Sequence, residues 1–439
     1  ILIQLTEAKR WNVTYGFGFE AQTGTPGQGK ISDASRIQLG LPLGGTGTQE
    51  GKPGVSPRVS RDVSRINRRG TEDTLTLHSA FGLVEKVAIL TLQNPHFYGS
   101  KTWSGAISGG YSNVRDITTF TSSTLQGDFR LTQRPQRKDT FIYDFQYRRV
   151  KVDPNSLQVS ADLIPLLSQP VRVGGPGITW FHDTRSPSPL DAVKGSYSTV
   201  QMFVASSKFG SETNFWKVDG SNSTYYQFGK EKYVLARSTR IGYERSWGTN
   251  PNAGSDACLG DLLTTNPSCS AVPLPERLYA GGATSLRGFG INGAGPRDLQ
   301  TGFPVGGTAA LVNTIELRMP APTLPFVGNS VNFVVFHDMG NVFQNPGKMF
   351  PSFLHFKQPN RDTCKEVLGV KVGTCSFNYF SHDIGLGARY KTPVGPVRLD
   401  FSYNLNPPIY PVIYDFENNP PHVGKAGHFN FFFSIGQSF

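Results

Sequence analysis

Apolar and polar residues alternate with a period of two along most of this chain. In 140–148 (TFIYDFQYR) and 397–404 (VRLDFSYN), every second residue is aromatic or aliphatic and the residues between them are mostly polar. The same alternation occurs in 383–390 and in the last segment, 428–439, where phenylalanines occupy most apolar positions. Because successive side chains of a β-strand point to opposite faces, the pattern predicts strands with one apolar and one polar face.

Sixteen segments of the chain carry this signal, and turn residues separate them. An even number of strands of about ten residues each is typical of single-chain bacterial outer-membrane barrels. No apolar run approaches the ~20 residues of a transmembrane helix. The predicted strands are 11–22, 55–66, 72–82, 85–93, 102–111, 117–131, 137–150, 175–182, 196–206, 222–229, 231–246, 309–319, 330–340, 381–392, 396–404 and 428–439.

The composition of the two faces separates a soluble β-sandwich from a membrane barrel. A sandwich fills its inner face with Val, Ile and Leu and turns its polar face to water. Here the apolar face is heavily aromatic, and the polar face mixes Arg and Asp with glycine; aromatic residues make up 12% of the chain. We therefore predict an all-β fold, a 16-stranded antiparallel transmembrane β-barrel with lipid outside and a wet lumen.

The connections between the predicted strands differ in length on the two sides of the barrel. Most turns expected on the inner side are short, as is typical of outer-membrane barrels. Residues 1–10 differ in character and predict the remnant of a preceding soluble module, with the barrel over 11–439. If the chain enters from the periplasm, the long outward loops are 23–54, 151–174, 247–308, 341–380 and 405–427.

The net charge of +11 would suit a nucleic-acid-binding protein, and the densest basic run is 58–70 (RVSRDVSRINRRG). This run has no interleaved aromatic residues, and no helix-turn-helix or RNA-binding motif surrounds it. We interpret it as a solvated or lumen-lining strand, and we expect no nucleic-acid partner.

The four cysteines form two pairs with the same spacing, Cys258 with Cys269 and Cys364 with Cys375, and both pairs fall in predicted outer loops. Local disulfides that close these loops fit an oxidising compartment. Zinc binding is the alternative, but it would require Cys-x-x-Cys spacing or close His ligands, which these pairs lack.

The stretch 279–298 (YAGGATSLRGFGINGAGPRD) contains the G-x-G-x-x-G spacing of a dinucleotide-binding loop at Gly288, Gly290 and Gly293. Such a loop must follow a buried strand and open a helix whose N-terminus meets the pyrophosphate. Pro296 and the nearby glycines interrupt any helix at this point. We therefore expect no nucleotide and no other cofactor.

The chain shows no catalytic or metal-binding constellation. His-Asp dipeptides occur at 182–183, 337–338 and 382–383. In the last two, neighbouring residues of a regular strand point to opposite faces and cannot converge on one ion; the first lies at a strand end, where we expect a turn role for Asp183. Ser285 has neither a neighbouring histidine base nor a G-x-S-x-G elbow. We expect that the protein is not an enzyme.

The glycine-rich stretch resembles the arginine-glycine-aromatic loop of the BamA superfamily of outer-membrane protein assembly factors, here Arg287, Gly288 and Phe289. In that family this is the sixth outer loop of a sixteen-stranded barrel, and it folds back into the lumen. The predicted loop 247–308 is also the sixth. The resemblance implies that the arginine meets acidic residues on strands twelve and thirteen, which by motif are Glu316 (NTIELR) and Asp338 (FHDMGNVF).

Further matches extend the resemblance to nearly the whole chain. The hairpin 389–403 (RYKTPVGPVRLDFSY) and the terminal 431–439 (FFFSIGQSF) resemble the last strands of bacterial surface-antigen-type members. The family's periplasmic POTRA domains are expected only as the remnant in 1–10. An inner-turn motif of the family, Asp-x-Arg followed by prolines and a glycine, is matched by Asp183, Arg185, Pro187, Pro189 and Gly195.

The resemblance implies a protein of the bacterial outer membrane that folds and inserts client β-barrel proteins. Its partners would be outer-membrane lipids, unfolded β-barrel clients and, through POTRA domains upstream, accessory periplasmic lipoproteins. A two-partner secretion pore of the same superfamily is the alternative. In lipid, an incoming strand needs an edge that supplies hydrogen bonds. The expected edge is the seam between the first and last strands, with Tyr15, Gly16, Gly18, Ser434, Gly436 and Phe439.

Overall fold

The computed structural model describes most of the chain. The described residues are 9–23, 54–68, 70, 72–82, 85–117, 119–187, 192–229, 232–260, 266–299, 301–320, 331–361, 364–367, 370–371, 375–392, 395–410, 412–414 and 426–435.

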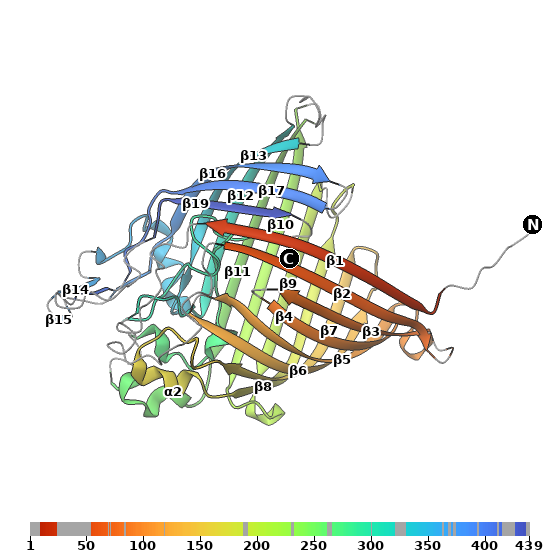
Figure 1. Ribbon diagram of the computed structural model, residues 1–439, viewed down its shortest axis with the longest axis horizontal. Coiled ribbons are helices and arrows are strands. Elements are labelled where there is room, and N and C mark those ends of the chain that lie inside the picture. The colour runs from red at the N-terminus through yellow and green to blue at the C-terminus, as the bar shows by residue number, and fades with distance from the viewer. Residues whose placement is uncertain are drawn as a thin grey trace, which may run out of the picture.

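Sixteen strands form one closed antiparallel barrel (Figure 1). All sixteen segments predicted from the alternation are strands of this barrel, so the predicted fold class is confirmed. The first eight strands are β1 (Trp11–Thr23), β2 (Gly54–Arg68), β3 (Asp73–Gly82), β4 (Glu85–Asn94), β5 (Trp103–Ile117), β6 (Phe120–Gln133), β7 (Asp139–Val152) and β8 (Val171–Asp183). The others are β9 (Gly195–Ala205), β10 (Phe215–Phe228), β11 (Tyr233–Ser246), β12 (Ala309–Pro320), β13 (Val331–Phe343), β16 (Ser381–Thr392), β17 (Gly395–Asn404) and β19 (Phe429–Ile435).

The side chains of the barrel wall divide as the alternation predicts. On β17, Phe401 is 55% exposed and its neighbour Ser402 only 2%. On β7, Tyr143, Phe145 and Tyr147 are also exposed. Soluble proteins bury most aromatic side chains, whereas a wall that faces lipid displays them. The barrel therefore has an apolar exterior, and polar residues line its interior.

Two strands, β8 and β10, begin several residues earlier than the sequence predicts. Strand β8 begins at Val171 rather than at 175, because the glycines after it are part of the strand and not of a turn. A Cβ atom on Gly175 would lie 1.8 Å from the carbonyl oxygen of Val204 on β9, so the close approach of the two strands requires glycine there. Strand β10 begins at Phe215 rather than at 222.

The long connections gather at one end of the barrel, which we call the outer end (Figure 1). A small three-stranded sheet that the sequence did not predict joins two of these loops; it consists of β14 (Lys365–Val367), β15 (Val370–Lys371) and β18 (Val412–Tyr414). A short helix, α2 (Ile164–Leu167), lies in the loop between β7 and β8. No helix in the described part of the chain is long and apolar enough to cross a membrane.

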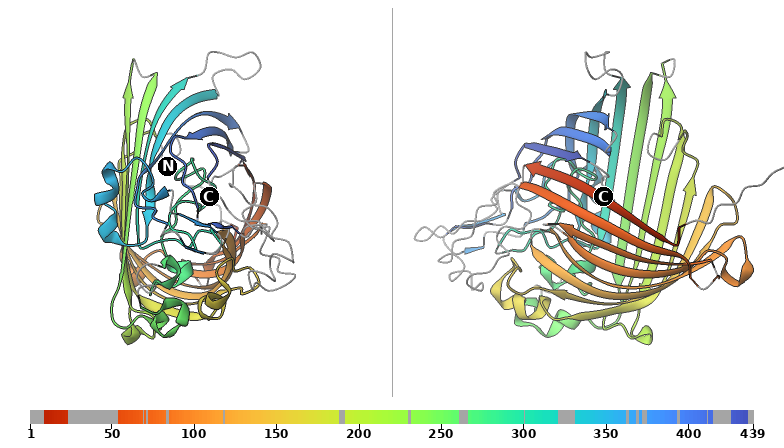
Figure 2. Two further views of the ribbon diagram at one scale, coloured as in Figure 1. Left: turned by 90° about the vertical axis from the view of Figure 1, so that its left-hand side faces the viewer. Right: turned by 45° about the vertical axis from the view of Figure 1, so that its right-hand side comes forward.

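The largest apolar core lies among the outer loops. Leu157 and Leu163 from the β7–β8 loop pack in one cluster with Leu274 and Phe289 from the β11–β12 loop and with Tyr410 from the β17–β19 loop. Viewed toward the outer end, the β11–β12 loop lies within the ring of strands (Figure 2, left). The described parts of the outer loops thus pack together into a cap at this end of the barrel.

Candidate functional site

The sixth outer loop, which joins β11 to β12, turns back into the lumen. Leu278 and Gly307 close the base of this excursion through two backbone hydrogen bonds of 2.9 and 3.0 Å. Two consecutive glycines, Gly281 (φ 124°) and Gly282 (φ 98°), have positive φ angles that other residues rarely adopt. The amide of Gly282 donates to the carbonyl oxygens of Leu286 and Phe289, both at 3.1 Å, which makes the turn before the arginine tight.

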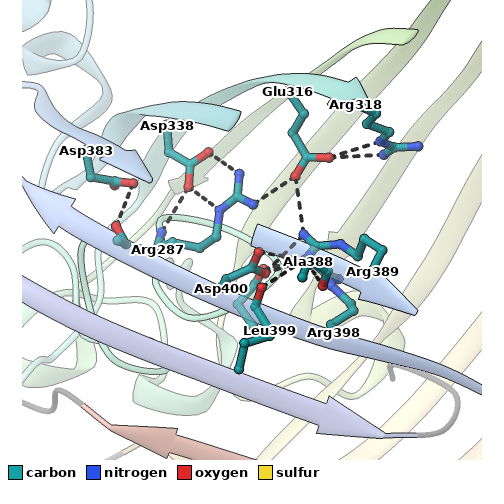
Figure 3. Close-up of polar contacts among 12 residues, drawn as sticks. Arg287, Glu316, Arg318, Asp338, Asp383, Ala388, Arg389, Arg398, Leu399 and Asp400 are labelled. Atoms are coloured by element: carbon teal, nitrogen blue, oxygen red, sulfur yellow. Dashed lines mark hydrogen bonds and ion pairs between the residues drawn. The ribbon is translucent and has the colours of Figure 1, made fainter. Parts of the chain in front are cut away.

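Arg287 is held by carboxylates from two neighbouring strands (Figure 3). Its Nε and Nη2 donate to the two carboxylate oxygens of Asp338 on β13, each at 2.7 Å. Its Nη1 donates to Glu316 Oε1 on β12 at 2.8 Å, and its backbone amide donates to Asp338 Oδ2 at 3.1 Å. The planar guanidinium matches a carboxylate in this two-point manner, which fixes direction as well as distance. The structure thus brings together the three residues that the resemblance singled out.

The surroundings of Arg287 strengthen this contact. The guanidinium is buried and lies 3.4 Å from the centre of the Phe336 ring. Burial alone would lower the pKa of Arg287, but the hydrogen bonds and charges of Asp338 and Glu316 raise it above its ordinary value. The arginine therefore keeps its charge at every accessible pH, and the contact is a buried, hydrogen-bonded ion pair.

Gly288 is fixed by the next two strands of the wall. Its amide donates to Asp383 Oδ2 on β16 at 2.8 Å, and its carbonyl oxygen accepts from Asn404 Nδ2 on β17 at 3.1 Å. A Cβ atom at this position would lie 2.7 Å from Asp383 Oδ2, so the cradle has room only for glycine. Phe289, the third residue of the motif, is buried in the apolar core of the cap.

Sequence reasoning missed Asp383 and Asn404. Alternation already placed Asp383 on a polar face, but nothing in the sequence connects it with a glycine 95 residues away. Strand register makes the connection: Asp338 lies opposite Asp383, and Asp383 lies opposite Asn404, on three consecutive strands. The loop tip thus contacts four adjacent strands, β12, β13, β16 and β17.

A belt of charges continues from Glu316 along the lumen wall (Figure 3). Glu316 accepts from Arg318 at 3.1 and 3.2 Å and lies 3.8 Å from Arg389. Arg389 in turn donates to the buried Asp400 at 2.6 and 3.1 Å, and Arg398 donates to Asp400 at 3.4 Å. Each buried carboxylate of this belt therefore has an arginine partner, as buried charges require.

A second ion pair, which the sequence did not suggest, holds the base of the loop on the opposite wall. Arg148 of β7 donates through Nε and Nη2 to the carboxylate of Glu276 at 2.8 and 2.6 Å. Burial alone would raise the pKa of Glu276, but the charge and hydrogen bonds of Arg148 lower it below the ordinary value. Lys217 of β10 donates to the Glu276 carbonyl oxygen at 3.1 Å. Here the wall supplies the cation and the loop supplies the acid.

The inner-turn motif forms a local ion pair. Arg185 donates through Nε and Nη2 to the two carboxylate oxygens of Asp183 at 2.9 and 2.7 Å, and its guanidinium lies 4.1 Å from the Tyr197 ring centre. Gly195 has a φ of 91°, which explains the glycine of the motif. Pro187 follows Arg185 in the turn between β8 and β9, and Pro189 lies outside the described residues.

The seam between β1 and β19 is placed differently from the prediction. Residues 19–23 of β1 pair with 431–435 of β19, so Ser434 lies opposite Glu20 and not near Tyr15. Tyr15, Gly16 and Gly18 pair with β2 on their other side. The sequence named Tyr15 and Ser434 as residues of the seam, but they are not partners: by alternation Tyr15 belongs to the apolar face and Ser434 to the polar face, and opposite residues of paired strands share a face. Gly436 and Phe439 lie outside the described residues.

The structure joins Cys258 to Cys269 and Cys364 to Cys375, as the sequence favoured. The first disulfide is buried in the apolar core of the cap, within the sixth loop. Among the described residues, no group of three or more His, Cys, Asp or Glu side chains could hold a metal ion.

A closed barrel of sixteen strands, apolar outside and with its sixth outer loop held against the lumen wall, defines the class: a transmembrane β-barrel with an inserted loop. Residues 67–439 match the sequence model of the Omp85 superfamily domain, and the chain belongs to this superfamily. Omp85 β-barrels reside in the bacterial outer membrane.

Solved structures of two kinds resemble the chain. BamA of Haemophilus ducreyi lacking POTRA domains 1–3 has a TM-score of 0.65 at 15% identity, over 96% of this chain and 70% of that chain. CdiB of Escherichia coli has a TM-score of 0.48 at 13% identity, over 98% and 63%. CdiB of Acinetobacter baumannii has a TM-score of 0.46 at 11% identity, over 95% and 60%. At these identities, the likeness to BamA shows the fold.

Proposed function

We propose that this chain is the membrane barrel of an outer-membrane assembly factor that folds and inserts client β-barrel proteins at the seam between β1 and β19. The observation that carries the proposal is that the first and last strands close the barrel by pairing directly with each other, while the neighbouring strand β17 is held separately by the inserted loop. The proposed location is the bacterial outer membrane, and the proposed partners are its lipids and unfolded β-barrel clients.

In the proposed function, separation of β19 from β1 supplies the edge on which a client strand pairs. Strand β1 pairs with β2 over residues 11–22, and among the described residues it pairs with β19 over 19–23. Unpaired backbone groups are costly in lipid, so an edge at membrane depth favours pairing with an incoming strand. A client strand would add to β1 by β-augmentation.

The inserted loop favours assembly over passive transport. This loop spans the barrel from Arg148 on β7 to Asn404 on β17, and both residues hydrogen-bond to it. An open porin needs a wet, continuous lumen. We therefore expect the barrel to act on its clients at its wall and not through its lumen. The described residues show no catalytic arrangement for another activity.

Two further parts of the proposal concern the residues that precede the barrel and the partners that would bind there. We propose that residues 1–10, of which 9–10 are described, belong to the end of a preceding periplasmic POTRA domain. Accessory periplasmic lipoproteins would bind to such domains. Cross-linking of the full protein in its native membrane, followed by identification of the attached lipoproteins, tests this part.

A disulfide across the seam tests the assembly function. The cysteines replace Glu20 and Ser434, which lie opposite each other in the register; Cα atoms of directly opposite residues on antiparallel strands lie about 4.5–5.5 Å apart, a separation that a disulfide can span. All four native cysteines are already paired, so the new thiols can react only with each other. The oxidised Glu20→Cys/Ser434→Cys protein, reconstituted in vesicles, should lose most of its ability to convert an added unfolded β-barrel client into a protease-resistant form.

The matched control places the same bridge elsewhere in the wall. Ser223 and Ser238 lie opposite each other on β10 and β11, with their hydroxyl oxygens 3.0 Å apart. The oxidised Ser223→Cys/Ser238→Cys protein should assemble clients as the wild type does. Equal activity of the two locked proteins would refute gating at the seam. If the unlocked protein folds no β-barrel client but lets a secreted client pass, the secretion pore replaces the assembly factor.

A further inference from the structure

The segment after β13 packs against the outside of the barrel wall. Two short 3-10 helices, η9 (Pro346–Lys348) and η10 (Pro351–Leu354), lie outside the ring of strands (Figure 2, left). Met349 is buried in a core cluster with Phe343 at the end of β13 and with Phe380 just before β16. Ser352 is also buried, and its hydroxyl donates to the Lys348 carbonyl oxygen at 2.6 Å. One side of this segment is therefore firmly attached to the wall.

The other side of the same segment displays four large apolar side chains. The exposed fractions are 67% for Phe350, 52% for Phe353, 88% for Leu354 and 48% for Phe356. We call these four residues the outer apolar patch. Rings of the patch are held in place: Phe353 contacts Phe380 edge-on, with 5.4 Å between the ring centres. Ordered apolar side chains gathered on one exposed surface are unusual in water and mark an interaction site.

The patch is continuous with the lipid-facing wall. The ring of Phe356 lies 5.1 Å from that of His382 on β16, and His382 lies 3.2 Å from His337 on β13. Both histidines point away from the lumen, since Asp338 and Asp383 beside them point into it. On the same outer faces, the exposed Val335 and Ile384 follow each histidine two positions further toward the inner end. The two imidazoles therefore lie where the apolar wall meets the patch.

Basic side chains flank the patch. Lys348, His355 and Lys357 are exposed on the same short segment, and no acidic residue occurs between 345 and 360. Aromatic and aliphatic side chains beside lysines are the composition of segments that lie in the interface of a bilayer, with the rings below the headgroups and the ammonium groups at the phosphates.

We propose that the outer apolar patch inserts into the leaflet at the outer end of the barrel, with Lys348 and Lys357 at the phosphate groups of anionic lipids. The patch would act as a lateral foot that fixes how deeply the β12–β13–β16 wall sits in the bilayer. This inference rests on the proposed location of the barrel in a membrane.

Site-specific quenching tests the inference. Leu354→Cys is labelled with an environment-sensitive fluorophore, and the protein is reconstituted in vesicles of phosphatidylcholine and phosphatidylglycerol at high lipid-to-protein ratio. Two matched variants receive the same label: Leu386→Cys on the β16 wall, where the leucine is 62% exposed, and Leu259→Cys in the cap, where it is 52% exposed. Nitroxide lipids with a spin label near the headgroup quench in the bilayer, and iodide quenches in water.

We expect nitroxide lipids to quench the label at 354 at least twice as strongly as the label at 259, and iodide to show the reverse order. If the label at 386 is quenched by lipid and the label at 354 behaves like that at 259, the barrel is in the bilayer and the patch is not. If the label at 386 is also unquenched, the membrane location itself fails. Quenching at 354 that depends on protein density would indicate a second copy of the chain and would overturn the lipid assignment.

A charge variant tests the phosphate contact separately. In Lys348→Glu/Lys357→Glu, lipid quenching at 354 should fall when phosphatidylglycerol is present and should match the parent in pure phosphatidylcholine. The same fall in both vesicle types would overturn the role of the lysines, because a general disturbance of the loop does not depend on lipid charge.

Discussion

Replacement of Arg287 by alanine removes the cation that holds the sixth loop in the lumen. Asp338, which is fully buried, would keep only the backbone amide of residue 287 as a partner from the loop. It would also face the buried Asp383 directly across the strand pair, without the guanidinium beside it. Removal of one partner from a buried ion pair costs about 3–5 kcal/mol, because the remaining charge stays desolvated. We expect Arg287→Ala to lower the free energy of unfolding by about this amount.

The matched control is Arg318→Ala. Arg318 donates to the same Glu316, but its side chain is 36% exposed, and Glu316 would keep Arg287. Partly exposed ion pairs contribute about 0–1 kcal/mol, so this variant should be close to the wild type. Urea unfolding in lipid vesicles measures both variants, and trypsin cleavage of the sixth loop on the folded protein reports whether the loop has left the lumen.

Addition of Asp338→Asn to Arg287→Ala separates electrostatics from packing. The amide carries no charge, so the double variant should recover part of the stability that Arg287→Ala loses, as a double-mutant cycle detects. The charge-based account of the anchor is wrong if Arg287→Ala and Arg318→Ala unfold at the same urea concentration. It is also wrong if the double variant loses as much stability as the Arg287→Ala and Asp338→Asn single variants lose together.

Three further predictions concern the same loop. Gly288→Ala brings a Cβ atom to 2.7 Å from Asp383 Oδ2 and should cost about 1–3 kcal/mol in urea unfolding, whereas Gly127→Ala, where the nearest atom is 3.9 Å away, should cost little. Because the pKa of Glu276 is lowered, its contribution is complete above the ordinary carboxyl pKa of about 4.3 and disappears as the pH falls through the lowered value. The stability difference between wild type and Glu276→Gln should therefore stay constant from about pH 8 to 5 and shrink in stronger acid; a difference that grows in acid would contradict this sign. Loss of the Cys258–Cys269 disulfide in a double serine variant should cost about 2–4 kcal/mol and expose the cap to protease, and unchanged protease resistance would argue against a role in the cap.

The barrel was predictable because each strand carries its own signal. Alternation depends only on neighbouring residues, so the wall at Phe401 and Ser402 could be assigned to its two faces before any strand was paired. Alternation did not predict the glycine-rich start of β8. Gly175 is a strand residue because β9 approaches closely, and a single sequence does not show that approach.

The site was predictable only where a motif identified both partners. Arg287, Glu316 and Asp338 could be named from the resemblance, and their contacts are present. Asp383 and the Arg148–Glu276 pair depend on strand register and on the path of a long loop, which join residues 95 and 128 positions apart. The seam shows the same limit for its register: alternation separates the apolar face of Tyr15 from the polar face of Ser434, but it does not identify Glu20 as the partner of Ser434.

The anchor formed by the sixth loop explains how, in the proposed mechanism, the seam between β1 and β19 can open while the rest of the barrel stays intact. Gly288 is bonded to Asn404 on β17, and Arg398 of the same strand donates to the Ala283 carbonyl oxygen of the loop at 3.4 Å. Strand β17 is thus fixed from inside the lumen, independently of its partner β19, with which it pairs over residues 397–403. In the proposed mechanism, β19 can separate from β1 while β17 stays in place, because the loop and not the seam holds that part of the wall. A barrel whose last strands lacked this support would lose both strands together, so in the proposed mechanism the buried arginine cluster confines opening to the pairing between β1 and β19.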